Sequence, residues 1–275
     1  MLTAVVMGLR PVAEARLPRC HGGLAYGAAM DLFLRLDPRL SRTLHEGGGP
    51  KPFTVSPLVG PFREEGGWLW VRPGEKYFWR ITGLTGAVSE CLGRLRAGGW
   101  GVRFGGAVLE VEEVAREGEE HPEAGQDSYE GLWARWGEGS GVGAVTLRFI
   151  TPTTFREGRR EEPFPLPVWV FGSLVGKWNA FGPEPLGLGR EAMEGGVVLG
   201  SWRGETRRVE LGRFRTVGFV GTFTYRVLEP GLGRWLGLLA DFAFYAGVGW
   251  QTTRGLGQVR PGALTPHSAS RSFPL

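Results

Sequence analysis

The sequence of 275 residues is poor in the side chains that build disulfide frameworks and metal sites. Its two cysteines, Cys20 and Cys91, form no close pair and no metal-like spacing. The four histidines, at positions 21, 45, 121 and 267, are scattered. These absences argue against a disulfide scaffold and a clustered metal centre, and they fit a reduced setting. We therefore expect a protein that works without a metal or another cofactor.

Long hydrophobic runs are also missing. The most apolar stretch, 232–250, contains Arg234 and Asp241, which argues against a membrane span. The N-terminus, MLTAVVMGL, has neither the basic flank nor the length of a signal peptide. The sequence therefore predicts a cytoplasmic protein without a membrane partner.

Arginine supplies almost all of the positive charge, because lysine occurs only at positions 51, 76 and 177. Residues 1–110 contain 14 basic and 9 acidic side chains, and residues 141–275 contain 16 basic and 10 acidic side chains. Residues 111–140 contain 2 basic and 9 acidic side chains. Two basic regions on either side of an acidic one indicate a polyanionic partner for the folded parts.

Hydrophobic periodicity predicts the order strand, helix, strand, strand, helix, strand in the first half of the chain, which is typical of a ferredoxin-like domain. Asp37-Pro38 predicts the N-cap and first residue of a short additional helix that ends near Glu46. The predicted elements are strands at 2–9, 51–58, 68–71, 77–82 and 100–114, and helices at 22–36, 38–46 and 83–97.

The same order repeats in the second half, so the pattern predicts a duplicated α+β fold. The acidic stretch is interpreted as a linker, which gives an N-terminal domain at 1–116, a linker at 117–140 and a C-terminal domain at 141–275. The predicted elements here are strands at 143–150, 196–202, 207–211, 216–228 and 255–260, the last ending at Pro261, and helices at 167–180, 186–193 and 232–245.

A glycine-rich loop lies between the last predicted helix and strand. It has the form Gly-x-Gly, five residues, Gly-x-Gly, with Gly247, Gly249, Gly255 and Gly257 as its glycines. Glycine permits positive φ and close approach of a ligand, and free N–H groups in such a loop form an anion-binding concavity. The order helix–loop–strand excludes a dinucleotide fingerprint, and the run GSLVGKW at 172–178 lacks the spacing of a phosphate loop.

This loop resembles the C-terminal signature of the RAMP superfamily of CRISPR-associated proteins. The fuller run FYAGVGWQTTRGLGQV resembles that of the superfamily's repeat-processing endoribonucleases, the "Cas six" group. The resemblance implies an α+β protein of tandem ferredoxin-like (RRM-like, βαββαβ) domains. It also implies catalytic residues in the N-terminal domain and CRISPR repeat RNA as the substrate.

A second stretch, LHEGGGPKPF at 44–53, resembles the catalytic region of that family. The resemblance implies that His45 is an acid/base catalyst and that Lys51 stabilises phosphate charge. It further implies a partner tyrosine on the first helix, for which Tyr26 is the candidate and His21 the rival. Histidine suits the reaction, because attack by the RNA 2′-hydroxyl needs a base, an acid and a cation but no metal. The products would carry a 5′-hydroxyl and a 2′,3′-cyclic phosphate.

RNA contacts are expected from a cluster of arginines and from the loop. The planar, permanently charged guanidinium is well suited to phosphate. The predicted RNA-binding residues are Lys177, Arg203, Arg207, Arg208, Arg213, Arg215, Gln251, Arg254 and the four loop glycines.

Two other functions remain open at this point. The protein could be a non-catalytic RAMP subunit that holds guide RNA, although the LHEGGGPKPF stretch favours the enzyme. It could also be a small-molecule enzyme on the same fold. The RNA could be recognised as a stem-loop or as a single strand, and the family resemblance leaves a homodimer and hand-over of RNA to a CRISPR effector complex open.

Overall fold

The structure is a computed structural model that describes residues 1–137, 141–158, 160–212 and 214–266. The chain divides into two compact units. Unit 1 comprises Met1–Ser128, Arg208–Thr216 and Gln251–Leu256. Unit 2 comprises Tyr129–Arg207, Val217–Trp250 and Gly257–Leu275.

Unit 1 contains a main antiparallel sheet in the order β3-β6-β1-β8-β7, with β9 also paired to β1. A smaller sheet has the order β2-β5-β4. The elements are β1 (Leu2–Pro11), β2 (Ala15–Pro18), α1 (Gly22–Leu36), α2 (Pro38–Glu46), β3 (Phe53–Val55), β4 (Arg63–Glu65), β5 (Trp68–Val71), β6 (Tyr77–Gly83), α3 (Gly86–Gly93), β7 (Gly101–Phe104), β8 (Ala107–Ala115), β9 (Gly125–Asp127) and the short 3-10 helix η2 (Thr252–Arg254).

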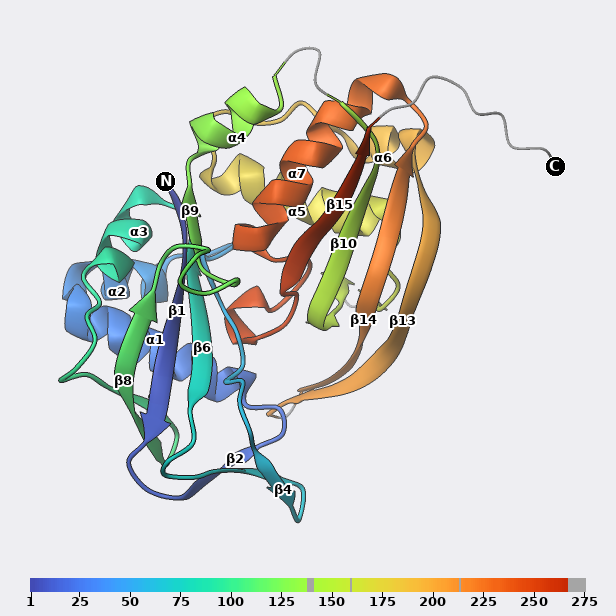
Figure 1. Cartoon of the computed structure of the whole chain (residues 1–275). Coiled ribbons are helices and arrows are strands. Elements are labelled where there is room, and N and C mark those ends of the chain that lie inside the picture. Colours follow the sequence, from blue (N-terminus) through green and yellow to red (C-terminus); the bar gives the residue numbers. More distant parts are fainter. Residues whose placement is uncertain (138–140, 159, 213, 267–275) are drawn as a thin grey trace. The chain divides into compact units, whose positions relative to one another are not determined.

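The helices α1, α2 and α3 cover one face of the main sheet (Figure 1). Val5, Met7 and Leu9 alternate along β1 and enter this core, as the period of two in a strand requires. The N-cap prediction for α2 is confirmed, because the Asp37 carboxylate accepts hydrogen bonds from the backbone N–H groups of Arg39 and Leu40, at 3.1 and 3.0 Å.

Unit 2 contains an antiparallel sheet in the order β13-β14-β10-β15 and a separate β11-β12 pair. Its elements are α4 (Tyr129–Arg135), β10 (Val142–Thr153), β11 (Phe155–Glu157), β12 (Arg160–Glu162), α5 (Pro167–Phe181), α6 (Arg190–Gly196), β13 (Val197–Leu211), β14 (Phe214–Val227), the 3-10 helix η1 (Pro230–Leu232), α7 (Gly233–Ala246) and β15 (Val259–Pro266). The ends of the long β13-β14 hairpin, from Arg208 to Thr216, belong to unit 1.

The two main sheets have the same topology. In each sheet, the fourth strand of the βαββαβ order lies beside the first strand. The third strand lies on the other side of the first, and the second strand lies beside the third. This order is β8-β1-β6-β3 in unit 1 and β15-β10-β14-β13 in unit 2. The prediction of tandem ferredoxin-like domains in an α+β protein is confirmed.

Three strands predicted in the second half have the wrong bounds. The strands expected at 196–202 and 207–211 form one continuous strand, β13. The final strand does not end at Pro261 but runs from Val259 to Pro266. A proline is tolerated there because β15 lies at the edge of its sheet and Pro261 pairs with Leu147 at a register shift.

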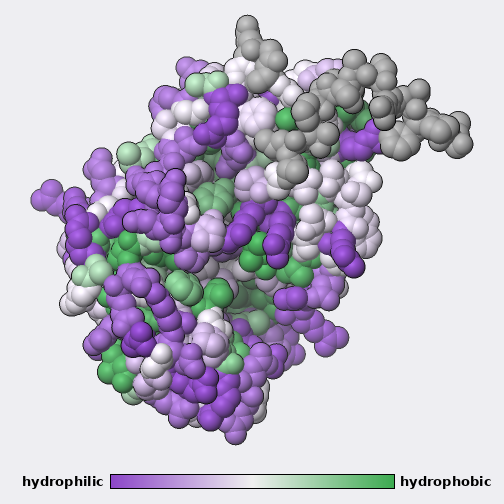
Figure 2. Space-filling view, viewed as in Figure 1, coloured by the Kyte–Doolittle hydropathy of each residue, from purple (hydrophilic) through white to green (hydrophobic). Residues whose placement is uncertain are grey.

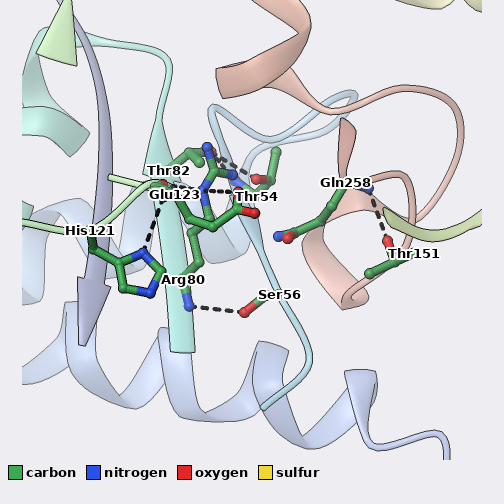
Figure 3. A network of polar contacts seen from close by, with 8 residues as sticks. All are labelled: Thr54, Ser56, Arg80, Thr82, His121, Glu123, Thr151 and Gln258. Carbon is green, nitrogen blue, oxygen red and sulfur yellow. Dashed lines mark hydrogen bonds and ion pairs between the residues drawn. The ribbon is translucent and has the colours of Figure 1, made fainter. Parts of the chain in front are cut away.

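The stretch 117–140, expected to be a linker, contains regular structure within its described residues. Residues Gly125–Asp127 form β9 beside β1, and Tyr129–Arg135 form α4. His121, for which the sequence suggested no role, accepts a hydrogen bond at Nδ1 from the backbone N–H of Glu123 at 3.1 Å (Figure 3). The Glu123 carbonyl in turn accepts from Nε of the buried Arg80 on β6, at 2.7 Å. Hydrogen bonds therefore fix Glu123 and β9 to the sheet of unit 1.

Hydrophilic side chains predominate on the face shown in Figure 2, with smaller hydrophobic areas between them. Across the described ranges, none of the helices combines the length and the apolar character that a membrane crossing requires.

Candidate functional site

The glycine-rich loop depends on a backbone conformation that favours glycine. The φ angles of Gly247, Gly249, Gly255 and Gly257 are +61°, +80°, +81° and +69°. Side chains with a Cβ rarely adopt this left-handed region. A Cβ at Gly249 would also lie 2.4 Å from the carbonyl oxygen of Thr154. The four glycines are therefore required by the shape of the loop itself.

The loop is not the open concavity of N–H groups that the sequence suggested. The N–H of Val248 donates to the carbonyl of Gly257 at 2.8 Å, and the N–H of Gly257 donates to the carbonyl of Pro152 at 3.0 Å. The N–H of Gly249 donates to Oγ of Ser173 at 3.0 Å. The expectation of free N–H groups for an anion is wrong at these three positions, because one N–H bonds within the loop and two bond to neighbouring segments of unit 2.

Helix α5 holds the start of the loop through two side chains one turn apart. Ser173 accepts the Gly249 N–H, and Nζ of Lys177 donates to the carbonyls of Ala246 and Gly247 at 2.9 and 3.0 Å. Burial of its amino group lowers the pKa of Lys177 to about 7. Lys177 thus caps the C-terminal carbonyls of α7, and its expected contact with RNA stays a prediction. The sequence analysis missed Ser173, whose position four residues before Lys177 on one helix was the available indication.

The second half of the loop belongs to unit 1, where η2 contacts α1 and β3. The exposed side chain of Arg254 places its guanidinium carbon 5.7 Å from the ring centre of Tyr26. The Tyr26 ring also stacks on Phe53, with 6.2 Å between the ring centroids. The loop thus brings a cation to the half-buried tyrosine that the sequence singled out.

His45 and Lys51 meet at the C-terminal end of α2. His45 is exposed in the last turn, beside a shallow hollow of about 370 Å³ that Met30 also lines, one turn after Tyr26 on α1. Nζ of Lys51 donates to the carbonyls of Leu44, at 2.6 Å, and Gly47. A lysine capping the last helix carbonyls is favourable, because the helix dipole is negative there. The single ammonium group of Lys51 therefore binds one carbonyl before His45 and one after it in the sequence.

His21, the rival to Tyr26, is a structural residue. Its side chain is only 3% exposed. Nδ1 donates to the carbonyl of Pro18 at 3.1 Å, and Nε2 accepts the N–H of Leu58 at 2.9 Å. Burial lowers the pKa of His21, so the neutral imidazole is favoured. The expectation that His21 is a catalytic group conflicts with this environment, because both ring nitrogens are used in holding the chain.

The arginines of the β13-β14 hairpin are exposed at positions 203, 207, 208 and 215, whereas Arg213 lies outside the described residues. Arg207 forms an ion pair with Glu205 at 2.8 Å, and Arg215 forms one with Glu210 at 3.4 Å. Half of the four described arginines therefore have part of their charge offset by a neighbouring carboxylate. Groups of three or more metal-ligating side chains are absent from the described part of the chain.

Comparisons with known proteins show to which family the chain belongs. The family model of the CRISPR-associated endoribonuclease Cas6 matches residues 147–259. A Thermus thermophilus Cas6 solved as a product complex is 32% identical, covers 95% of this chain and 100% of its own, and superposes with a TM-score of 0.77. The chain belongs to the Cas6 family.

Other Cas6 proteins agree with this assignment. A further Cas6 product complex is 29% identical over 95% of this chain and 99% of its own, with a TM-score of 0.73. The curated Cas6 of Mycobacterium tuberculosis is 32% identical over 125 residues. That match covers 44% of this chain and 39% of the relative, so the aligned part spans well under half of the mycobacterial protein. A RAMP protein that binds different RNA substrates is 12% identical with a TM-score of 0.62, which supports the fold alone.

Replacing Gly22 with alanine should destabilise the packing of the glycine-rich loop on α1. A Cβ at Gly22 would lie 1.8 Å from the carbonyl oxygen of Arg254, so either the loop or the helix must move. We expect the free energy of unfolding to fall by about 1–3 kcal/mol. Gly23→Ala is the matched control, because a Cβ there meets nothing within 4 Å. Equal urea midpoints for the two variants would contradict the close contact.

The buried His21 should make the protein sensitive to mild acid. Because its pKa is lowered in the folded state, the unfolded chain binds the proton first as the pH falls below about 6.5. Stability should therefore decrease with falling pH, by up to about 1.4 kcal/mol per pH unit from this one group. Urea midpoints from about pH 8 to about pH 5 should fall less steeply for His21→Gln than for the unsubstituted protein. Parallel curves would show that His21 does not cause the acid sensitivity.

Proposed function

We propose that this protein is a metal-independent endoribonuclease that cleaves CRISPR repeat transcripts. The observation that carries the proposal is the exposed imidazole of His45 at an end of α2 whose carbonyls are capped by Lys51. Similar Cas6 proteins were solved as a product complex and as a substrate-mimic complex. Family membership, an accessible acid/base group and neighbouring positive charge support the same chemistry.

The proposed reaction uses the nucleophile of the RNA itself. The 2′-oxygen forms a new bond to the adjacent phosphorus and gives up its proton to a base, while the bond from phosphorus to the 5′-oxygen breaks. The leaving 5′-oxygen takes a proton from an acid. The ends are then a 2′,3′-cyclic phosphate and a 5′-hydroxyl. Histidine serves as acid or base because its protonation changes near neutral pH.

Three further side chains have supporting roles in this proposal. Two of the three ammonium protons of Lys51 bind carbonyls, so Lys51 fixes the end of α2 and contributes its charge near the phosphate. Tyr26 is the second catalytic candidate, since its ring lies beside Phe53 and the guanidinium of Arg254. Arg254 would stabilise negative charge on the RNA through its fork of N–H donors.

RNA binding is proposed to involve the exposed hairpin arginines in addition to Arg254. Arg203 and Arg208 are the stronger candidates, because Arg207 and Arg215 share their charge with glutamates. Dimerisation, hand-over of the product to an effector complex and a cytoplasmic location remain predictions. The alternative function, a non-catalytic RAMP subunit, predicts that the protein binds the repeat RNA but does not cleave it.

The decisive test is incubation with a CRISPR repeat RNA in excess EDTA, followed by analysis of the new ends. We expect cleavage at a single position to continue, because no step needs a metal ion. The upstream product should carry a 2′,3′-cyclic phosphate, and the downstream product a 5′-hydroxyl. RNA binding without cleavage would favour the non-catalytic subunit, and a 5′-phosphate would contradict attack by the 2′-oxygen.

Replacing His45 with alanine should slow single-turnover cleavage by roughly 10²–10⁴-fold, the usual contribution of acid–base catalysis. The dissociation constant for repeat RNA should change little, because the exposed imidazole contributes one contact among many. Thr43→Ala is the matched control on the exposed surface of the same helix. Unchanged cleavage by His45→Ala would remove this residue from the mechanism.

A further inference from the structure

The hollow beside His45 lies between α1 and α2, two consecutive helices of unit 1. Met30 and Leu34 line it from α1, four and eight residues after Tyr26. Because residues four apart lie on the same side of a helix, the hollow continues the side of α1 that carries Tyr26. Its volume of about 370 Å³ is within the range of small-ligand sites, which is about 300–1,000 Å³. The hollow therefore has room for a small ligand and begins beside the candidate catalytic residues.

The surface of the hollow is largely apolar and open to water. Leu34 is 53% exposed, and Met30 is half-buried. Pro38, which is exposed at the start of α2, also lines the hollow. Small-ligand sites typically combine apolar walls of this kind with a few well-placed polar groups. The faces of a nucleobase are flat and weakly polar, so this surface suits a base.

The cationic side chains of the hollow come from α2, where Arg42 and His45 are both exposed. They are three residues apart, so they are neighbours on the helix surface, with Cβ atoms about 5–6 Å apart. Among the described residues, the Arg42 guanidinium has no hydrogen-bond or ion-pair partner, and Glu46, one turn further along, does not bind it. The five N–H donors of Arg42 are therefore available to a ligand.

The neighbouring charged groups are already paired. The carboxylate of Asp31, which lines the hollow from α1, forms an ion pair with Arg35 at 3.1 Å. Nζ of Lys51 donates to two backbone carbonyls at the end of α2. A guanidinium such as that of Arg42 binds a phosphate through two parallel N–H bonds. An apolar surface beside an available guanidinium matches a nucleotide, in which a base and a phosphate are joined by one sugar.

We propose that this hollow binds the nucleotide next to the scissile phosphate, with its base against Met30 and Leu34 and its own phosphate at Arg42. This inference rests on the proposed function, because His45, at one end of the hollow, is the proposed acid/base group. An RNA strand that is cut in its interior continues past the cut on both sides, and the hollow adjoins His45. The bound nucleotide is unpaired, since the faces of a base within a duplex are covered by its neighbours. Arg42 thus positions the strand and does not transfer a proton.

The phosphate contact is tested with Arg42→Ala and a repeat RNA that carries 2′-deoxyribose at the cut nucleotide, so that it is bound but not cleaved. We expect the slope of the logarithm of affinity against the logarithm of salt concentration to become shallower by about 0.7, the value for one phosphate contact of a single strand. Arg39→Ala is the matched control, because Arg39 is an exposed, unpaired arginine of the same helix within the described chain but does not line the hollow. Equal slopes for the two variants, whether lowered or unchanged, would overturn the phosphate contact.

The base contact is tested with Leu34→Ser and the same RNA. We expect affinity to fall roughly 3- to 10-fold, because covering about 30–55 Å² of apolar surface strengthens binding by that factor. The RNA is then made with an abasic nucleotide on either side of the cut, one side at a time. On one side the abasic RNA should bind the unsubstituted protein and Leu34→Ser equally well, because the base that meets Leu34 is missing. A full effect of Leu34→Ser on both abasic RNAs, or none on the intact RNA, would overturn the base contact.

Cleavage of the unmodified repeat RNA separates this inference from the proposed function. Single-turnover cleavage by the unsubstituted protein, with binding that is indifferent to Arg42→Ala and Leu34→Ser, would refute the hollow alone. If the unsubstituted protein does not cleave, the unmodified RNA serves as the binding probe. Binding that depends on Arg42 and Leu34 without any cleavage would refute the proposed nuclease and leave the hollow as an RNA-binding site.

Discussion

The left-handed backbone at the four loop glycines is the constraint on which the candidate site depends. This backbone conformation lets the chain turn out of α7, form η2 and continue into β15. The N–H of Val248 donates to the carbonyl of Gly257 and joins the two ends of the loop. A Cβ is excluded at Gly249 by the nearby carbonyl of Thr154. Within unit 1, the η2 part of the loop places the guanidinium carbon of Arg254 5.7 Å from the ring centre of Tyr26 on α1.

Two histidines of unit 1, His21 and His45, lie in opposite environments. His21 is buried with both ring nitrogens bonded, and its pKa is lowered, so it stabilises the entry into α1. His45 is exposed at a helix end whose carbonyls bind the ammonium of Lys51. An acid/base catalyst must reach the proton that it transfers, and only the exposed imidazole meets that condition.

The two ferredoxin-like units keep the same strand order but differ in what they add to it. Unit 1 inserts α2 after its first helix, which places His45 and Lys51 at one helix end. In unit 2 the first helix of the fold, α5, binds the start of the glycine-rich loop through Ser173 and Lys177. The duplicated fold therefore supplies two sheets of the same topology, and the local additions give each unit its own polar side chains.

The sequence by itself determined the duplicated strand and helix order, the N-cap at Asp37 and the glycine-rich loop, because these follow from local periodicity, capping and the φ range of glycine. Only the tertiary structure decided that Lys177 caps α7, that His21 is buried and that the N–H groups of Val248, Gly249 and Gly257 are already bonded. A lysine or histidine looks the same in a sequence whether it faces water or a distant carbonyl. Its role depends on which segments fold against it, and those contacts join residues far apart in the chain.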